Sequence, residues 1–240
     1  MKKILMAALL VSLGFSACVF TTGKKVRGDG NVTSSNRTPG SFSEVEQKGF
    51  FDVELVVGDQ PSVTLEGEEN IISKIETYVS GSTLKIQTED GFDLRPSRDV
   101  RIKVTAPSYK KVFSYGSGNI ISQSMVKNDE PIEVGTKGSG DIKMEIMAPE
   151  VTASIYGSGN VTLKGETRKV TLECTGSGDL NAVDLLSEEA NVDIKGSGNA
   201  SVNSSKSLQV DVKGSGDVRY KGNPSIRSDI RGSGNIKKLD

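Results

Sequence analysis

The chain has 240 residues, enough for a modest globular body of about two parts. Its 30 basic and 31 acidic residues give a formal net charge of −1, so the cationic excess of a nucleic-acid-binding protein is absent. Aromatic residues make up only 5% of the chain, and tryptophan and histidine are missing, so the core must consist of small and branched aliphatic side chains. We expect no nucleic-acid partner.

The first 17 residues resemble a bacterial lipoprotein signal peptide. Met1-Lys2-Lys3 is a basic start, Ile4 to Val11 is an apolar segment too short to span a bilayer, and Phe15-Ser16-Ala17 precedes Cys18. The resemblance implies that Cys18 becomes the first mature residue and carries lipid, although Phe15 stands where leucine is common. Ordinary signal-peptidase cleavage and a retained segment are the alternatives.

The residues after Cys18 bear on location. Val19 rather than aspartate follows, which by resemblance to enterobacterial sorting rules favours the outer membrane, and no acidic run signals surface export. We therefore expect an exported outer membrane lipoprotein, held by its lipid anchor and facing either the periplasm or the surface. Residues 18–40 are rich in glycine, threonine, serine and lysine and predict a tether.

Residues 41–109 predict a β-rich region that caps the rest of the chain. Alternating apolar and polar residues indicate strands with one buried face. They lie at Phe51 to Val57, Ser62 to Glu66, Thr83 to Gln87 and Val100 to Val104. Between the second and third strands, Glu69 to Val79 has apolar residues at helical spacing and predicts one short helix. A solenoid leaves open strand edges at its ends, so this region is suited to cover one of them.

Residues 110–240 contain seven copies of the motif Gly-Ser-Gly-Asn/Asp, 22, 19, 19, 20, 18 and 18 residues apart. The first glycine and the last residue of each copy are Gly116 and Asn119, Gly138 and Asp141, Gly157 and Asn160, Gly176 and Asp179, Gly196 and Asn199, Gly214 and Asp217, and Gly232 and Asn235. We interpret them as structural turns, because glycine reaches positive φ and Asn or Asp tolerates the left-handed region and bonds its own backbone. A repeat of this length predicts an all-β fold, a parallel β-solenoid with coils of about 19 residues.

The strict alternation of Asn and Asp supports one motif per coil. Equivalent residues of stacked coils would lie about 4.8 Å apart, where two carboxylates repel by roughly 1 kcal/mol in water. Alternation places a neutral amide between them. Cys174, in an inward column beside Leu172, is interpreted as a buried small hydrophobic residue, and with Cys18 acylated it has no disulfide partner.

The chain also resembles a known family, the putative autotransporter adhesin, head GIN domain family, which is frequent among lipoproteins of Bacteroidetes. The resemblance spans roughly Phe42 to Asp240. It rests on the order of Phe42-Ser43-Glu44-Val45, Leu84-Lys85-Ile86, Val104-Thr105-Ala106-Pro107 and Tyr115-Gly116-Ser117-Gly118-Asn119 with its later copies. It implies an extracytoplasmic β-solenoid, and the adhesin label is itself an analogy.

An enzyme is not expected. Outward acids such as Glu173, Asp193 and Asp211 recur at the same place in successive coils, as in a solvated ladder rather than a singular catalytic site. The calcium β-roll needs half-coils of nine residues with regular aspartates, whereas these coils are near 19 residues and half of them carry Asn. We expect no catalytic residue, no metal and no cofactor.

The column of residues immediately before the turns is the most suggestive surface. It holds Tyr115, Lys137, Tyr156, Thr175, Lys195, Lys213 and Arg231. Two tyrosines and four cations could stack on sugars or hold an acidic polymer, and ordinary outward residues paired with adjacent acids are the alternative. The leading hypothesis is a non-catalytic, adhesin-like envelope module that binds a glycan or an envelope protein. The alternatives are a structural protein that self-assembles into homo-oligomers through its open edge and, third, a polysaccharide-active β-helix enzyme.

Overall fold

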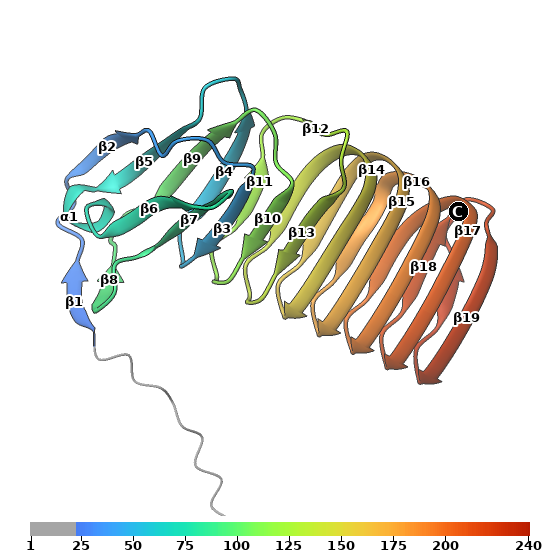
Figure 1. The fold of residues 1–240 in the computed structure, drawn as a ribbon. Coiled ribbons are helices and arrows are strands. Elements are labelled where there is room, and N and C mark those ends of the chain that lie inside the picture. Colours follow the sequence, from blue (N-terminus) through green and yellow to red (C-terminus); the bar gives the residue numbers. More distant parts are fainter. Residues whose placement is uncertain (1–22) are drawn as a thin grey trace, which may run out of the picture.

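The computed structural model describes residues 23–240, which form an elongated β-solenoid closed at one end by a small cap (Figure 1). The predicted signal peptide and Cys18 lie outside the described residues. Within residues 23–240, no helix has the length and apolar character needed to cross a membrane.

The cap contains short strands and one helix, and its last part leads into the first coils. The elements are β1 Lys24–Arg27, β2 Val32–Arg37, β3 Glu44–Lys48, β4 Asp52–Val57, β5 Ser62–Glu68, α1 Glu69–Ile72, β6 Ile75–Ser80, β7 Thr83–Thr88, β8 Phe92–Arg95 and β9 Arg101–Ala106. The four strands predicted from alternation in this region are all present, as β4, β5, β7 and β9.

The solenoid consists of parallel strands that lengthen as the coils become regular. They are β10 Lys111–Ser114, β11 Ile120–Ser122, β12 Val126–Lys127, β13 Ile132–Thr136, β14 Ile142–Gly157, β15 Val161–Gly176, β16 Leu180–Gly196, β17 Ala200–Gly214, β18 Val218–Lys221, β19 Ser225–Gly232 and β20 Ile236–Lys238. Each of β14 to β17 bends once, so its two halves belong to opposite faces of the solenoid. One face runs through β3, β10, β13 and on to β19, and the other through β4, β11 and on to β20.

The register confirms one motif per coil. Gly157 pairs with Gly176, Gly176 with Gly196, Gly196 with Gly214 and Gly214 with Gly232. The predicted inward columns are buried through most of the solenoid, including Cys174 at 1% exposure. In the last coil Ser228 is exposed and Ile230 is only half-buried, because no further coil covers them within the described chain.

The cap closes the first coils with antiparallel strands. β7 and β9 continue the two parallel faces. Beyond them the pairing is antiparallel: β6 pairs with β7, β5 with β9, and β2 with β5. The prediction of a helix over residues 69–79 is wrong beyond its first turn. α1 ends at Ile72, and Ile75–Ser80 forms β6, since Gly81 (φ +65°) allows a hairpin to β7 and Ile75 reaches the core as a strand residue.

The predicted tether is also partly wrong, because residues 24–37 contain β1 and β2. Arg37 of β2 donates to the carbonyl oxygens of Ile75 (2.6 Å) and Ile72 (3.1 Å). Buried Glu68 accepts hydrogen bonds from the backbone of Gly30 (2.7 Å) and from the backbone N–H and hydroxyl of Ser97 (2.7 and 2.5 Å). These hydrogen bonds, that of the Ser97 hydroxyl first, lower the pKa of Glu68. Long-range contacts therefore fold this segment onto the cap.

The glycines of the motif are required by stacking as much as by turning. A Cβ on Gly176 would lie 2.2 Å from the carbonyl oxygen of Gly157, and one on Gly178 would lie 2.0 Å from that of Gly159. Gly176 has a φ of +138°, whereas the φ of Gly178 is not positive. Glycine is therefore required at position 178 only because a Cβ would clash with the neighbouring coil. Successive turns thus approach each other backbone to backbone.

The Asn and Asp side chains form a continuous hydrogen-bonded stack that we term the Asn/Asp ladder. Each Oδ1 accepts the backbone N–H of the equivalent residue in the next coil at 2.9 to 3.0 Å. In addition, Asn160 and Asn199 donate their Nδ2 groups to Asp141 and Asp179, both at 2.9 Å. The expectation that these residues adopt the left-handed region is wrong, since no described non-glycine residue has positive φ. Their side chains bond the adjacent coil rather than their own backbone.

The ladder starts one coil earlier than the motif indicates. Asn119 donates its backbone N–H (2.9 Å) and its Nδ2 (3.1 Å) to Asp52 Oδ1. Asp52 ends the segment Gly49-Phe50-Phe51-Asp52, a degenerate copy of the turn, and Gly49 lies directly against Gly116. The alternation of Asp and Asn therefore extends over eight positions, and every Asp in it accepts from the Asn that follows.

We predict that the double change Asn160→Asp and Asn199→Asp destabilises the protein. It removes two amide donors and creates a run of carboxylates from Asp141 to Asp217, in which neighbours about 4.8 Å apart repel by roughly 1 kcal/mol each. Chemical denaturation should show a loss of about 2 to 4 kcal/mol in the free energy of unfolding.

The matched control is Asp179→Asn, which changes the ladder without adding charge and should lower stability less. The deficit of the double variant should shrink in molar salt, because exposed charges are then screened. An unchanged melting temperature in low salt would contradict the role of the ladder.

A second prediction concerns the register of the core. Val192 is 3% exposed, whereas the side chain of Asp193 is 43% exposed and pairs with Lys195 at 3.2 Å. Val192→Asp should lower the free energy of unfolding by about 4 kcal/mol by burying an unpaired charge, and Asp193→Asn should change it by less than about 0.5 kcal/mol. Similar shifts of the melting temperature for the two variants would mean that the faces are assigned wrongly.

Candidate binding surface

The residues that precede the turns form one continuous column along an edge of the solenoid. Tyr156 pairs with Thr175, Thr175 with Lys195, Lys195 with Lys213 and Lys213 with Arg231. At the other end the register continues, because the Lys137 N–H donates to the Ser114 carbonyl (2.8 Å). We call this set the edge column; its members are Lys48, Tyr115, Lys137, Tyr156, Thr175, Lys195, Lys213 and Arg231.

The cap-side half of the edge column alternates cations with aromatic rings. Lys137 Nζ lies 5.5 Å from the ring centroid of Tyr115 and 5.4 Å from that of Tyr156. Lys48 Nζ lies 5.6 Å from the Tyr115 ring on its other side. These distances allow cation–π attraction, so the four side chains hold each other in a row. Tyr156 remains 45% exposed, which leaves aromatic surface for a ligand.

Tyr115 is fixed further by its own strand. Its ring lies 6.1 Å from that of Phe113, which in turn covers Gly135 of the next coil. Burial, and to a lesser extent the charge of Glu46, raises the pKa of the Tyr115 hydroxyl, so this group is neutral at physiological pH. The neutral phenol of Tyr115 therefore lies between the ammonium groups of Lys48 and Lys137.

The far half of the edge column carries cations without aromatic residues. Lys195 pairs with Asp193 at 3.2 Å and Arg231 with Asp229 at 2.8 Å, and the side chains of both pairs are largely accessible to solvent. Exposed pairs of this kind contribute little stability and compensate the positive charge locally. This half corresponds to the interpretation as ordinary outward residues, whereas the cap-side half does not.

Lys48 was missed by the sequence interpretation. It directly precedes Gly49, the first residue of the degenerate turn, and so occupies the same position as Tyr115 and Lys137 in later coils. The available signal was Asp52, which keeps the spacing of the motif although Phe50 and Phe51 replace its second and third residues.

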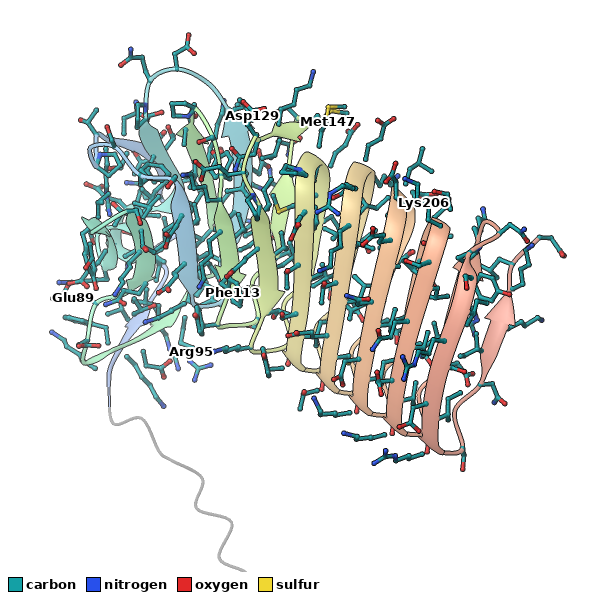
Figure 2. The ribbon with its side chains drawn as sticks, turned by 45° about the vertical axis from the view of Figure 1, so that its right-hand side comes forward. Glu89, Arg95, Phe113, Asp129, Met147 and Lys206 are labelled. Atoms are coloured by element: carbon teal, nitrogen blue, oxygen red, sulfur yellow. The ribbon has the colours of Figure 1, made fainter. Side chains whose placement is uncertain are left out.

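A groove of about 850 Å³ crosses the opposite, bent edge of the solenoid. Its lining includes Asp129, Met147, Arg168, Leu186 and Ser205, and Figure 2 shows Asp129 and Met147 along this edge. The loop after β12 forms one wall. The other wall is formed by the parts of β16 and β17 where the pairing of these two strands is irregular. Met147 and Leu186 are 37% and 52% exposed, while Arg168 already pairs with Glu150.

No constellation for catalysis is brought together in the described part of the chain. Residues 23–240 contain no cluster of three or more Cys, Asp or Glu residues that could hold a metal ion. Burial raises the pKa of the Cys174 thiol, which donates to the Gly178 carbonyl (3.2 Å), so it is a poor nucleophile at neutral pH. The structure thus leaves the edge column and the groove as the candidate surfaces.

Comparison with solved structures reveals close similarity of fold. A putative lipid binding protein from Parabacteroides distasonis is 27% identical, with a TM-score of 0.74, and the match covers 90% of this chain and 100% of that one. A putative adhesin from Bacteroides fragilis is 20% identical, with a TM-score of 0.85 and coverage of 89% and 100%. A putative adhesin from Parabacteroides merdae is 21% identical, with a TM-score of 0.66 and coverage of 90% and 99%.

The identities of the two adhesins are low, so they show the fold alone. No curated protein matches the chain. The sequence profile of the family described as "Putative auto-transporter adhesin, head GIN domain" matches residues 41–224, which is most of the chain. The match covers the cap from β3 onward and the solenoid down to β18, whereas β1 and β2 precede it. The chain therefore belongs to the putative auto-transporter adhesin, head GIN domain family.

Proposed function

We propose that this protein is a non-catalytic, adhesin-like module of the cell envelope that binds an acidic glycan along the cap-side half of the edge column. The observation that carries the proposal is the row of Lys48, Tyr115, Lys137 and Tyr156, in which two lysines and two aromatic rings alternate on a rigid edge. The family name and the adhesin names of the structural relatives support a binding role.

The chemistry of the row favours an extended polyanion with sugar rings. Tyrosine faces stack on the apolar faces of sugars, and ammonium groups attract carboxylates or sulfates. Equivalent atoms of successive coils are about 4.8 Å apart, so Tyr115 and Tyr156 recur at about 9.6 Å along a straight line. A regular ligand could therefore contact several coils at once, and its affinity would accumulate from weak contacts.

The rigidity of the edge is part of the proposal. Each residue of the edge column is followed by a glycine turn that is hydrogen-bonded to the turn of a neighbouring coil, as in Ser158 N–H to Gly138 carbonyl (3.1 Å). The backbone of this edge is therefore already ordered before a ligand binds, which limits the conformational entropy lost on binding.

The groove supports a lipid ligand less well. A lipid-binding name belongs to the relative from Parabacteroides distasonis. In this chain the groove is open to solvent, and Asp129 and Glu166 line it beside Met147 and Leu186, together with Glu188, which pairs with Lys206 at 2.7 Å. Carboxylates would be desolvated next to an acyl chain, which is unfavourable without partners.

The glycan proposal is tested by titrating the full chain with a uronate polysaccharide and with a sulfated polysaccharide. Lys137→Glu should weaken binding at least about tenfold, equivalent to about 1.4 kcal/mol, because it reverses the charge between two rings. Tyr156→Ala should weaken it by a smaller factor through lost stacking. The wild-type affinity should fall with added salt.

The matched control is Lys143→Glu, which makes the same charge change at an exposed residue in the first half of β14. That half pairs with β11 on the other face of the solenoid. It should leave the affinity within about twofold of wild type. Equal weakening by Lys137→Glu and Lys143→Glu would show only nonspecific attraction, and absence of binding by the wild type to either polymer would overturn the choice of ligand.

We further propose that Cys18 anchors the module to the outer membrane through lipid, as the signal-like N-terminus indicates. Wild-type protein expressed in a Gram-negative host should partition into the detergent phase, and the mass of its N-terminal peptide should include acyl chains. Cys18→Ala should give soluble or unprocessed protein.

The second cysteine provides the control for this experiment. Cys174→Ala should still partition with detergent, because that thiol is buried in the solenoid. Recovery of an unacylated wild-type N-terminus from the membrane fraction would contradict the proposed anchor.

A further inference from the structure

The two ends of the solenoid differ in whether further strands cover them. At the cap, β2, β5 and β6 run antiparallel to their neighbours and cover the first coils (Figure 1). At the opposite end, within the described residues, β19 pairs with β17 alone and β20 with β18 alone. Each of these strands therefore has one free edge of backbone N–H and C=O groups, which can pair with another chain.

The free edge also leaves apolar core residues exposed. Ile226 of β19 is 41% exposed, whereas its register partner Leu208 one coil further in is 1% exposed. Ile230 and Ile236 are only partly buried, although their counterparts Val212 and Val218 are fully buried. Within residues 23–240, no further strand covers the core of the solenoid at this end.

The sequence of β19 is complementary to itself when read in the opposite direction. Ile226, Ser228 and Ile230 face the core, since they pair in register with buried Leu208, Val210 and Val212. Arg227 and Asp229 face outward on either side of Ser228, and both are exposed. About Ser228 as a centre, isoleucine therefore matches isoleucine and arginine matches aspartate.

We propose that this end is a homodimer interface in which β19 pairs antiparallel with β19 of a second copy about a two-fold axis at Ser228. In such a pair, directly opposite residues point to the same face. Ile226 would lie opposite Ile230 of the partner copy and extend the core across the interface. Arg227 would lie opposite Asp229 of the partner copy on the outer face, and the axis generates each contact twice.

Neighbouring registers are excluded by charge or by face. A centre at Asp229 places this carboxylate opposite itself and Arg227 opposite Arg231, and a centre at Arg227 places two guanidinium groups together. A centre between two residues sets a core-facing residue opposite an outward one. A centre at Ile230 keeps the faces and sets Asp229 opposite Arg231, but it pairs only Ser228 to Gly232 of β19. The Ser228 centre joins both cores and pairs opposite charges over Ser225 to Arg231, seven of the eight residues of β19, about 23 Å.

The charge pairing is tested in the full chain carrying Cys18→Ala, which removes the expected acylation. Sedimentation velocity should show a monomer–dimer equilibrium for this parent protein. Arg227→Asp and Asp229→Arg should each weaken dimerisation at least about tenfold, because like charges then lie opposite each other at two symmetric places. The double swap of both residues should restore the parent affinity to within about threefold.

Arg219→Asp is the matched control, since this exposed arginine lies on β18, which pairs on both sides and offers no free edge. It should leave dimerisation unchanged. Circular dichroism melting of each variant separates a lost interface from a lost fold.

Crosslinking provides a second, independent readout. Ser228→Cys should form an intermolecular disulfide under mild oxidation, because opposite residues of an antiparallel pair have Cα atoms about 4.5 to 5.5 Å apart, within disulfide range. Ser225→Cys should not, since Arg231 would lie opposite it. A strictly monomeric parent protein, a double swap that fails to restore dimers, or equal crosslinking through Ser225→Cys would each overturn the proposal.

Discussion

The close approach of successive turns is the constraint on which the rest of this structure depends. Two backbones meet there with no room for a Cβ, as the 2.2 Å that would separate a Gly176 Cβ from the Gly157 carbonyl shows. The Asn/Asp ladder then satisfies the amide groups that this approach leaves between the coils. Glycine provides the space and the alternating side chains provide the hydrogen bonds, so the turns of successive coils are held in register.

Because the turns are locked in register, the chain places one residue per coil in each column. Inward columns become a narrow aliphatic core, which explains why so few aromatic residues suffice. Outward columns become rows whose chemistry the sequence can vary without disturbing the fold. The edge column uses this freedom: Lys137 lies between Tyr115 and Tyr156, whereas Lys195 and Arg231 merely balance adjacent aspartates. The same regular stacking leaves one edge of β19 without a partner strand in the part of the chain that the structure describes.

The sequence predicted the solenoid well because its information is local and repeated, but it predicted the cap less well. Ile71, Ile75 and Val79 fit helical spacing, yet Ile75 and Val79 also alternate as strand residues, and only the pairing of β6 with β7 decides between them. The predicted tether failed since β2 is held by distant partners, Arg37 on Ile75 and Glu68 on Gly30. The sequence interpretation missed Lys48 and Asp52 because Phe50 and Phe51 replace the second and third residues of the turn motif between them.

The central claim is that the Asn/Asp ladder is one continuous hydrogen-bonded stack from Asp52 to Asn235. Hydrogen exchange measured by NMR on the backbone amides of the ladder residues tests it most directly. We predict that the amides of Asp141, Asn160 and Asp179 exchange only through global unfolding, while that of Asn235, at the uncovered end, exchanges faster. Rapid exchange at all of these positions, at rates typical of exposed turns, would contradict the account.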